Sequence, residues 1–187
     1  NQIWQDRTGK PLISATCPDT IYDPIGFAIW RPMAEAMGWP NQPISWDSLA
    51  ALAADPKGWG KYGHPEWGQF KFGHTLPESS NSGLLILTAL AYETLGWDND
   101  LTPEMVKGDA VISAMREIEK YTIVYGKQSE VLLALMVQRG DSYLHAVNTN
   151  EAEVLKTNVK YGNLLPSKLV FIFPEHGTFW AQHPYCI

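Results

Sequence analysis

Residues 70–84 read FKFGHTLPESSNSGL, and this stretch contains the unit from which the fold follows. Residues 70–73, with one phenylalanine on each side of Lys71, predict a short strand, and the polar run 74–82 predicts a turn. Residues 84–95 are apolar almost all round, which predicts a helix that is buried on most of its sides. A strand, a turn and a buried helix in direct succession are typical of α/β proteins.

The same alternation continues in both directions along the chain. Further strands are predicted at residues 25–30, 143–147 and 168–173, with a turn at 175–180 before a last strand-like segment. Cap and stop residues predict further helices at 31–38, 45–54, 102–120, 129–140 and after Glu151. Residues 1–24 are polar and are expected to be irregular. The predicted fold class is therefore α/β, with a mostly parallel mixed sheet flanked by helices.

The composition argues against several classes of partner. The 187 residues are 45% hydrophobic, which is enough for one folded domain with a core. The 14 Lys and Arg residues are outnumbered by 20 Asp and Glu residues, and the isoelectric point is about 5.3. This balance disfavours nucleic acid and anionic membrane surfaces as main partners. The longest apolar stretch, residues 84–92, is far shorter than the roughly 20 residues that span a bilayer.

The two ends and the two cysteines bear on the origin of the chain. The sequence starts at Asn1 and stops at Ile187 in a strand-like segment, so we expect a piece of a longer protein. Cys17 and Cys186 lie near opposite ends and have no metal-binding spacing. They are either two free thiols or a disulfide that joins the two end segments, as an exported protein would allow.

Motifs for catalysis and for cofactors are missing or stand in the wrong context. Residues 58–63 match the GxGxxG pattern, but they follow a predicted helix instead of a strand, so they predict no dinucleotide site. The chain has no nucleophile elbow, P-loop or HExxH motif, and none of its five histidines is spaced for a zinc pair on a helix. We therefore expect no metal, no cofactor and no enzymatic activity.

The turn and helix start at residues 74–83 form the best candidate binding site. Hydroxyl and amide side chains stand where the free backbone N–H groups of a helix start point outward, which suits a carboxylate, an oxyanion or a polar solute. Ordinary helix capping by Asn81 or Ser82 explains the same residue types equally well. The candidate ligand-binding residues of this segment are His74, Thr75, Ser80, Asn81 and Ser82.

Three more segments are expected at the same edge of the sheet, where α/β proteins bind ligands. The turn at 125–129 opens a helix and contributes Ser129. Residues 148–151 end in Glu151, an acid that favours a cationic or hydroxyl-rich group over a bare anion. Residues 175–180 follow the strand at 168–173, and there Thr178 and Trp180 offer a hydroxyl and an aromatic wall. Trp180 would equally well fill the core.

Several stretches of the chain together carry a family resemblance: residues 27–36, 55–59, 63–68, 70–75, 80–84, 125–126, 177–180 and 183–184. They resemble bacterial extracellular solute-binding proteins of the type 2 periplasmic-binding class. The resemblance is strongest to the branch associated with von Willebrand factor type A domains, and it covers most of residues 24–187 in the same order. The chain departs from the family's pattern at Glu130 and at Asn150-Glu151.

This resemblance implies a two-lobed protein that clamps a small polar solute between its lobes. Residues 25–180 would be the second lobe, a single α/β solute-binding unit, and residues 1–24 and 181–187 would be the two hinge segments. The hinge would also give Cys17 and Cys186 a reason to lie close together. The implied partners are the missing first lobe, a membrane permease of the ABC type and a von Willebrand factor type A domain. The implied location is periplasmic or extracellular, with a membrane anchor before Asn1 as one option.

Two other functions are kept as alternatives. A metal-assisted hydrolase would use His74, His176 or His183 and would require a bound metal or turnover. An adaptor domain would dock a partner protein through the aromatic loop from Trp59 to Trp67, and would require both tryptophans to face solvent.

Overall fold

The computed structural model, which describes residues 2–12, 17–97 and 100–184, is built around one long strand, β1 (Asp19–Trp30). The inner half of β1 pairs with β4 (Ala146–Asn150) on one side and with β5 (Leu169–Ile172) on the other. Its outer half pairs with β6 (Trp180–Pro184).

The sheet continues from β4 to β2 (Phe72–Thr75) and then to β3 (Thr122–Gly126), in the order β3-β2-β4-β1-β5. Strand β2 is parallel to both of its neighbours, whereas β1 is antiparallel to β4, β5 and β6. Within the described ranges, five strands therefore run in one direction and β1 runs against them. The predicted mixed, mostly parallel α/β sheet is confirmed.

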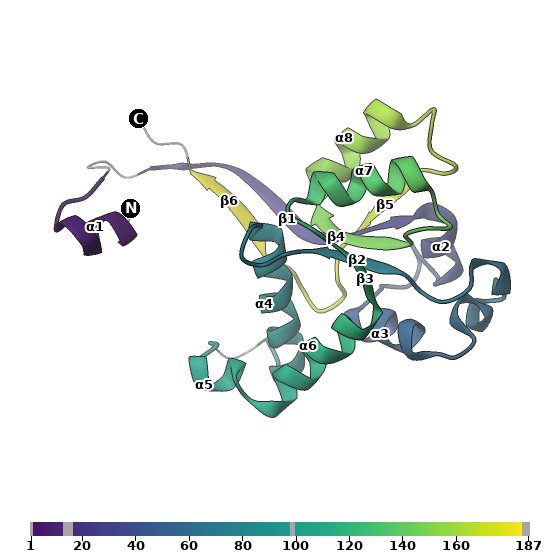
Figure 1. The fold of residues 1–187 in the computed structure, drawn as a ribbon, viewed down its shortest axis with the longest axis horizontal. Coiled ribbons are helices and arrows are strands. Elements are labelled where there is room, and N and C mark those ends of the chain that lie inside the picture. The colour runs from purple at the N-terminus through teal and green to yellow at the C-terminus, as the bar shows by residue number, and fades with distance from the viewer. Residues whose placement is uncertain (1, 13–16, 98–99, 185–187) are drawn as a thin grey trace.

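Helices cover both faces of this sheet (Figure 1). Helices α7 (Ser129–Arg139) and α8 (Glu151–Tyr161) pack together over one face. Helices α4 (Asn81–Leu95), α6 (Asp109–Tyr121) and α3 (Trp46–Ala54) lie on the other. The remaining elements are α1 (Gln2–Thr8), α2 (Arg31–Ala36), α5 (Pro103–Val106) and the short 3-10 helices η1 (Gly58–Tyr62) and η2 (Pro65–Trp67).

The core forms around the apolar half of β1, as its continuous hydrophobic run predicts. Residues 25–30 are fully buried because helices and neighbouring strands enclose them from all sides. Phe27 contacts Trp46 and Phe72 edge to face, with ring centroids 4.5 and 6.2 Å away. The indole N–H of Trp30 donates to the carbonyl of Leu144 at 2.7 Å, so this buried donor is satisfied.

The outer half of β1 and strand β6 form a two-stranded ribbon that projects from the body, with α1 beyond its end (Figure 1). The expectation that residues 1–24 are irregular is wrong, because they include α1 and the start of β1. The expected segment boundaries after residues 24 and 180 both fall inside strands. Cys17 is disulfide-bonded, which excludes a free thiol at this position; Cys186 lies outside the described residues.

Several predicted elements differ from the observed ones. Strand β2 begins at Phe72 instead of residue 70, β4 spans Ala146–Asn150 instead of 143–147, and β3 was not predicted. The single helix expected at 102–120 is two helices, because Gly108 caps the start of α6. Helix α4 begins at Asn81 and leaves Leu84 53% exposed, so it is less buried than predicted.

The GxGxxG segment folds as the 3-10 helix η1, which excludes a strand–turn–helix phosphate loop. Trp59 in this segment is fully buried, and its indole N–H donates to Nδ1 of His145 at 2.9 Å. Burial and the nearby charge of Lys71 lower the pKa of His145 to about 3. The aromatic loop therefore packs inward, with Trp67 also half-buried, and the exposure that the adaptor alternative requires is not met.

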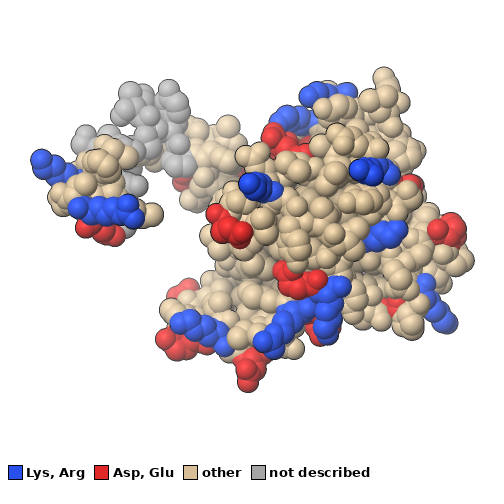
Figure 2. Space-filling view, in the orientation of Figure 1, with Lys and Arg blue, Asp and Glu red and all other residues tan. Residues whose placement is uncertain are grey.

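The surface visible in Figure 2 is mostly uncharged, and its basic and acidic side chains are interspersed. No continuous stripe of one sign crosses this face. Within the described ranges, no helix has the length and apolar character needed to cross a membrane.

Candidate functional site

Three helix N-termini converge at one edge of the sheet. Strands β2, β3 and β4 are parallel and each is followed by a helix, so α4, α7 and α8 all begin at the carboxyl edge. Their N-cap residues are Ser80, Gln128 and Asn150, and in none of them does the side chain cap its own helix. All three N-caps line one hollow of about 300 Å³. The hollow therefore faces backbone N–H groups that have no partner within their helices.

The opposite wall of the hollow comes from the ribbon of β1 and β6. Because β1 runs against the other strands, its outer half extends beyond the carboxyl end of β4, where Ile25 pairs with Asn150. Asp23 of β1 and Ala181 and His183 of β6 line the hollow from there. Neighbouring residues of a strand face opposite sides, so Trp180 lies on the other face of the ribbon.

A cluster of hydroxyl groups forms the floor of the hollow. The Ser82 hydroxyl is 2.8 Å from that of Ser80, 2.8 Å from that of Ser129 and 3.0 Å from that of Thr75. Asn148 lies behind Thr75: its amide oxygen accepts the Thr75 backbone N–H at 2.8 Å, and its Nδ2 donates to Thr75 Oγ1 at 3.1 Å. We call these five residues the hydroxyl cluster. It ties the starts of α4 and α7 to strands β2 and β4.

Acidic side chains surround this floor. Asp23, Glu130 and Glu153 line the hollow, and Asp23 accepts the backbone N–H of Ala152 at 3.3 Å. Lys156 donates to Glu130 at 2.7 Å, and this contact lowers the pKa of the Glu130 carboxyl. Glu130 and Glu153 stand in the first turns of α7 and α8, where they offset the positive ends of the helix dipoles. The hollow is therefore polar, and its acidic side chains weaken the attraction of anions to the helix N-termini.

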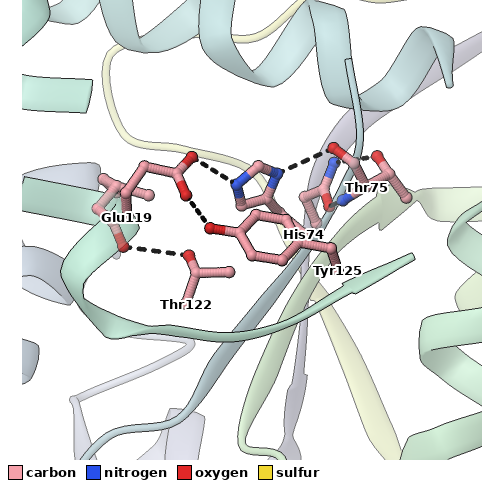
Figure 3. A network of polar contacts seen from close by, with 7 residues as sticks. His74, Thr75, Glu119, Thr122 and Tyr125 are labelled. Atoms are coloured by element: carbon pink, nitrogen blue, oxygen red, sulfur yellow. Dashed lines mark hydrogen bonds and ion pairs between the residues drawn. The ribbon is translucent and has the colours of Figure 1, made fainter. Parts of the chain in front are cut away.

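His74 belongs to a separate network on the other side of β2 (Figure 3). Its side chain is buried, with Nδ1 donating to the Thr75 carbonyl at 2.9 Å and Nε2 lying 2.8 Å from Glu119. The Tyr125 hydroxyl donates to the same Glu119 carboxylate, and burial together with this bond raises the pKa of Tyr125 to about 12. The network joins α6 to β2 and β3, which is a structural role.

The histidines offer no support for the hydrolase alternative. His74 is enclosed in its network, and His176 is paired with Glu93 on the side of α4. His183 lines the hollow, but the described part of the chain contains no group of three His, Cys, Asp or Glu side chains placed to hold a metal.

The structure brings together only some of the predicted site residues. Ser80, Asn81, Ser82 and Ser129 line the hollow, and Thr75 lies directly beneath Ser82. Glu151 is the first residue of α8, between the lining residues Asn150 and Glu153, but it is not itself part of the lining. His74, Thr178 and Trp180 lie elsewhere; the Thr178 hydroxyl donates to the carbonyl of Ile25.

Sequence reasoning missed Asp23, Glu153 and Ala181, and it placed Asn148 in a loop at the binding edge without naming it as a site residue. Asp23 and Ala181 are brought to the hollow by the pairing of β1 with β6, which lie about 160 residues apart in the sequence, and no local sequence pattern indicates that pairing. Glu153 had a weak signal, since it follows the expected ligand loop by two residues. Asn148 was expected in a loop, whereas it is fully buried within β4.

Solved structures that resemble this fold include proteins described as solute-binding. An extracellular solute-binding protein of Bordetella parapertussis matches 90% of this chain with a TM-score of 0.59 at 11% identity. A periplasmic thiamin-binding protein matches 91% with a TM-score of 0.59 at 13% identity. An ABC transporter protein of Clostridium perfringens matches 98% with a TM-score of 0.55 at 14% identity.

These similarities establish the fold, which is that of a lobe of a solute-binding protein. The matches cover only 42%, 42% and 47% of those three chains, so this chain spans less than half of their length. No protein-family model and no curated protein matches the sequence.

Proposed function

We propose that this chain is one lobe, the second, of an exported solute-binding protein of the type 2 periplasmic class, and that it binds a small polar solute without catalysing a reaction. The observation that carries the proposal is the convergence of three helix N-termini, none capped by its own N-cap side chain, on one hollow. Backbone N–H groups at helix starts and hydroxyl groups suit a polar solute, and among the residues that the structure describes no set of catalytic groups accompanies them.

The hollow is half of a site in this proposal. Several of its lining residues, including Asn81, Gln128 and Glu130, are exposed, so this chain alone would leave a bound solute in contact with water. A first lobe would close over it by hinge motion and expel that water. The ribbon of β1 and β6 borders the hollow and leads away from the body, which suits the two hinge crossings (Figure 1).

The remaining parts of the proposal follow from this function. The complete protein would be periplasmic or extracellular, would deliver its solute to a membrane permease of the ABC type, and would carry or accompany a von Willebrand factor type A domain. A membrane anchor outside the present chain would keep it near its permease.

A thermal-shift comparison tests the proposal. The complete two-lobed protein and the 187-residue chain are each heated with oxyanions, amino acids, sugars and metal ions. A solute at about one hundred times its Kd stabilises the folded state by about 2.7 kcal/mol, which raises the Tm by several degrees. We expect one solute class to stabilise the complete protein and to have little effect on this chain. Tight binding by this chain alone, or no shift in either protein, would contradict the proposal.

A further inference from the structure

The hydroxyl cluster has a fixed hydrogen-bond direction at its inner end. The Thr75 backbone N–H is only a donor, so the Asn148 atom that faces it must be the amide oxygen. The other amide atom, Nδ2, is then a donor, and it points its hydrogen at Thr75 Oγ1. One lone pair of the Thr75 hydroxyl is therefore occupied.

The Thr75 hydroxyl must donate to Ser82. Thr75 is fully buried, and within the described ranges its Oγ1 contacts only Asn148 Nδ2 and Ser82 Oγ. Nδ2 cannot accept a hydrogen bond, so Ser82 Oγ is the one acceptor available for the Thr75 hydrogen. The reverse direction would leave a buried hydroxyl hydrogen without a partner.

The hydrogen bonds of the cluster branch at Ser82 into two arms, one to Ser80 and one to Ser129, and Ser82 donates along one arm and accepts along the other. Its hydroxyl accepts from Thr75 and has one hydrogen, which goes to either Ser80 or Ser129. The other serine must then donate its own hydrogen to Ser82, or the contact between them would join two lone pairs. Ser82 thereby makes three hydrogen bonds and has no capacity left. It is a branch point and makes no further bond into the hollow.

Ser80 and Ser129 consequently present different groups to the hollow. The serine that accepts from Ser82 keeps its hydrogen and one lone pair free, and the serine that donates to Ser82 keeps only lone pairs free. Ser129 is only 8% exposed and lines the hollow, so little water reaches its free group. Exchanging the two serines' roles leaves the pair with the same free groups: one hydrogen to donate, and lone pairs on both oxygens to accept.

We propose that the solute is a neutral polyhydroxylated compound and that one of its hydroxyl groups bridges Ser80 and Ser129. A hydroxyl group donates to one serine and accepts from the other, so it satisfies both. A carboxylate has no hydrogen for the free lone pairs, and an ammonium group has no acceptor for the free serine hydrogen, so each leaves part of the pair unsatisfied. Asp23, Glu130 and Glu153 around the hollow also disfavour an anion. This inference rests on the proposed function, because it names the substrate class of the same site.

An NMR titration of the 187-residue chain tests it with three five-carbon probes: xylitol, glutarate and cadaverine. Xylitol donates and accepts, glutarate only accepts, and cadaverine only donates. We expect xylitol to shift the backbone amide signals of Ser80, Ser82 and Ser129 in a saturable way at millimolar concentrations. At equal concentration and ionic strength, glutarate and cadaverine should bind more weakly there.

Two matched serine variants provide the control. S129A removes one arm and should weaken xylitol binding about fivefold, as expected for one lost hydrogen bond. S79A should leave it unchanged, because Ser79 is exposed and bonds only to the Leu76 and Lys127 carbonyls among its described contacts. Unchanged binding in S129A would overturn the inference.

The remaining outcomes separate the two proposals. Tighter binding of glutarate or cadaverine at the same amides would overturn the polyol inference and leave the solute-binding function in place. Absence of any shift at these amides with all three probes would overturn the polyol inference alone, because the proposed function expects this chain by itself to bind weakly; the thermal-shift comparison with the complete protein tests that function separately.

Discussion

Thr75 and Thr149 form a natural pair for testing how the site is held together. Both are fully buried in the sheet, Thr75 in β2 and Thr149 in β4. The Thr75 hydroxyl bonds to Asn148 at 3.1 Å and to Ser82 at 3.0 Å. The Thr149 hydroxyl has no hydrogen-bond partner in the part of the chain that the structure describes. Replacing each residue by Val removes the same hydroxyl and keeps the branched shape.

The two substitutions should therefore have opposite signs. T75V leaves Asn148 and Ser82 with unpaired buried groups, which costs about 1–3 kcal/mol of unfolding free energy. T149V removes an unpaired buried hydroxyl and should raise the unfolding free energy by about 1 kcal/mol. Both residue types suit a strand, so backbone propensity contributes little to the difference. We expect a gap of about 2–4 kcal/mol between the two variants.

Urea unfolding of the wild type and the two variants measures this gap. The slopes of the free energy against urea should stay equal, so that midpoints can be compared directly. A loss of stability in T149V as large as that in T75V would refute the reasoning. It would mean either that the Thr149 hydroxyl does have a hydrogen-bond partner, or that the number of hydrogen-bond partners of a buried hydroxyl does not determine stability in this sheet.

Three further predictions concern other parts of the fold. Burial lowers the pKa of His145 to about 3, below its ordinary 6.5, so the unfolded chain binds more protons and stability is lost as pH falls from above 6.5 toward 3. Between pH 7.5 and about pH 5, protonation of His145 in the unfolded chain should lower the unfolding free energy by about 2 kcal/mol, as measured by urea unfolding. H145N keeps an acceptor atom in the place of Nδ1 and should lose less stability over that range. An equal loss in H145N would contradict the lowered pKa of His145. G83A should lower the unfolding free energy by about 1–2 kcal/mol although Ala favours helices, because its Cβ would stand 2.4 Å from the Thr75 carbonyl oxygen; a stabilised variant would show that α4 does not rest on β2. Y125F should remove one phenol that titrates near pH 12 in a spectrophotometric titration, since burial and Glu119 raise that pKa; a lower titration point would argue against the bond to Glu119.

Local sequence patterns were enough to predict the elements that are marked by neighbouring residues, such as apolar runs and helix caps. The apolar run at 25–30 is the buried half of β1, and the helix predicted at 45–54 is α3, which Ser45 caps. The helix predicted after Glu151 is α8, which begins at Glu151 itself. The alternation of strands and helices was then enough to predict the α/β class and the edge at which helix N-termini would gather, because parallel strands followed by helices place those ends together.

Tertiary structure alone decided the register of β4 and the walls of the hollow. Asn148 and Thr149 are polar, so a hydrophobic pattern assigns them to a loop, whereas Asn148 is tolerated inside the sheet through its bonds to Thr75. His74 was expected at the binding edge, but Glu119 and the Thr75 carbonyl hold it in the interior. Asp23 and Ala181 reach the hollow only through the pairing of β1 with β6. These placements depend on partners far away in the sequence, and local propensity and periodicity carry no information about such partners.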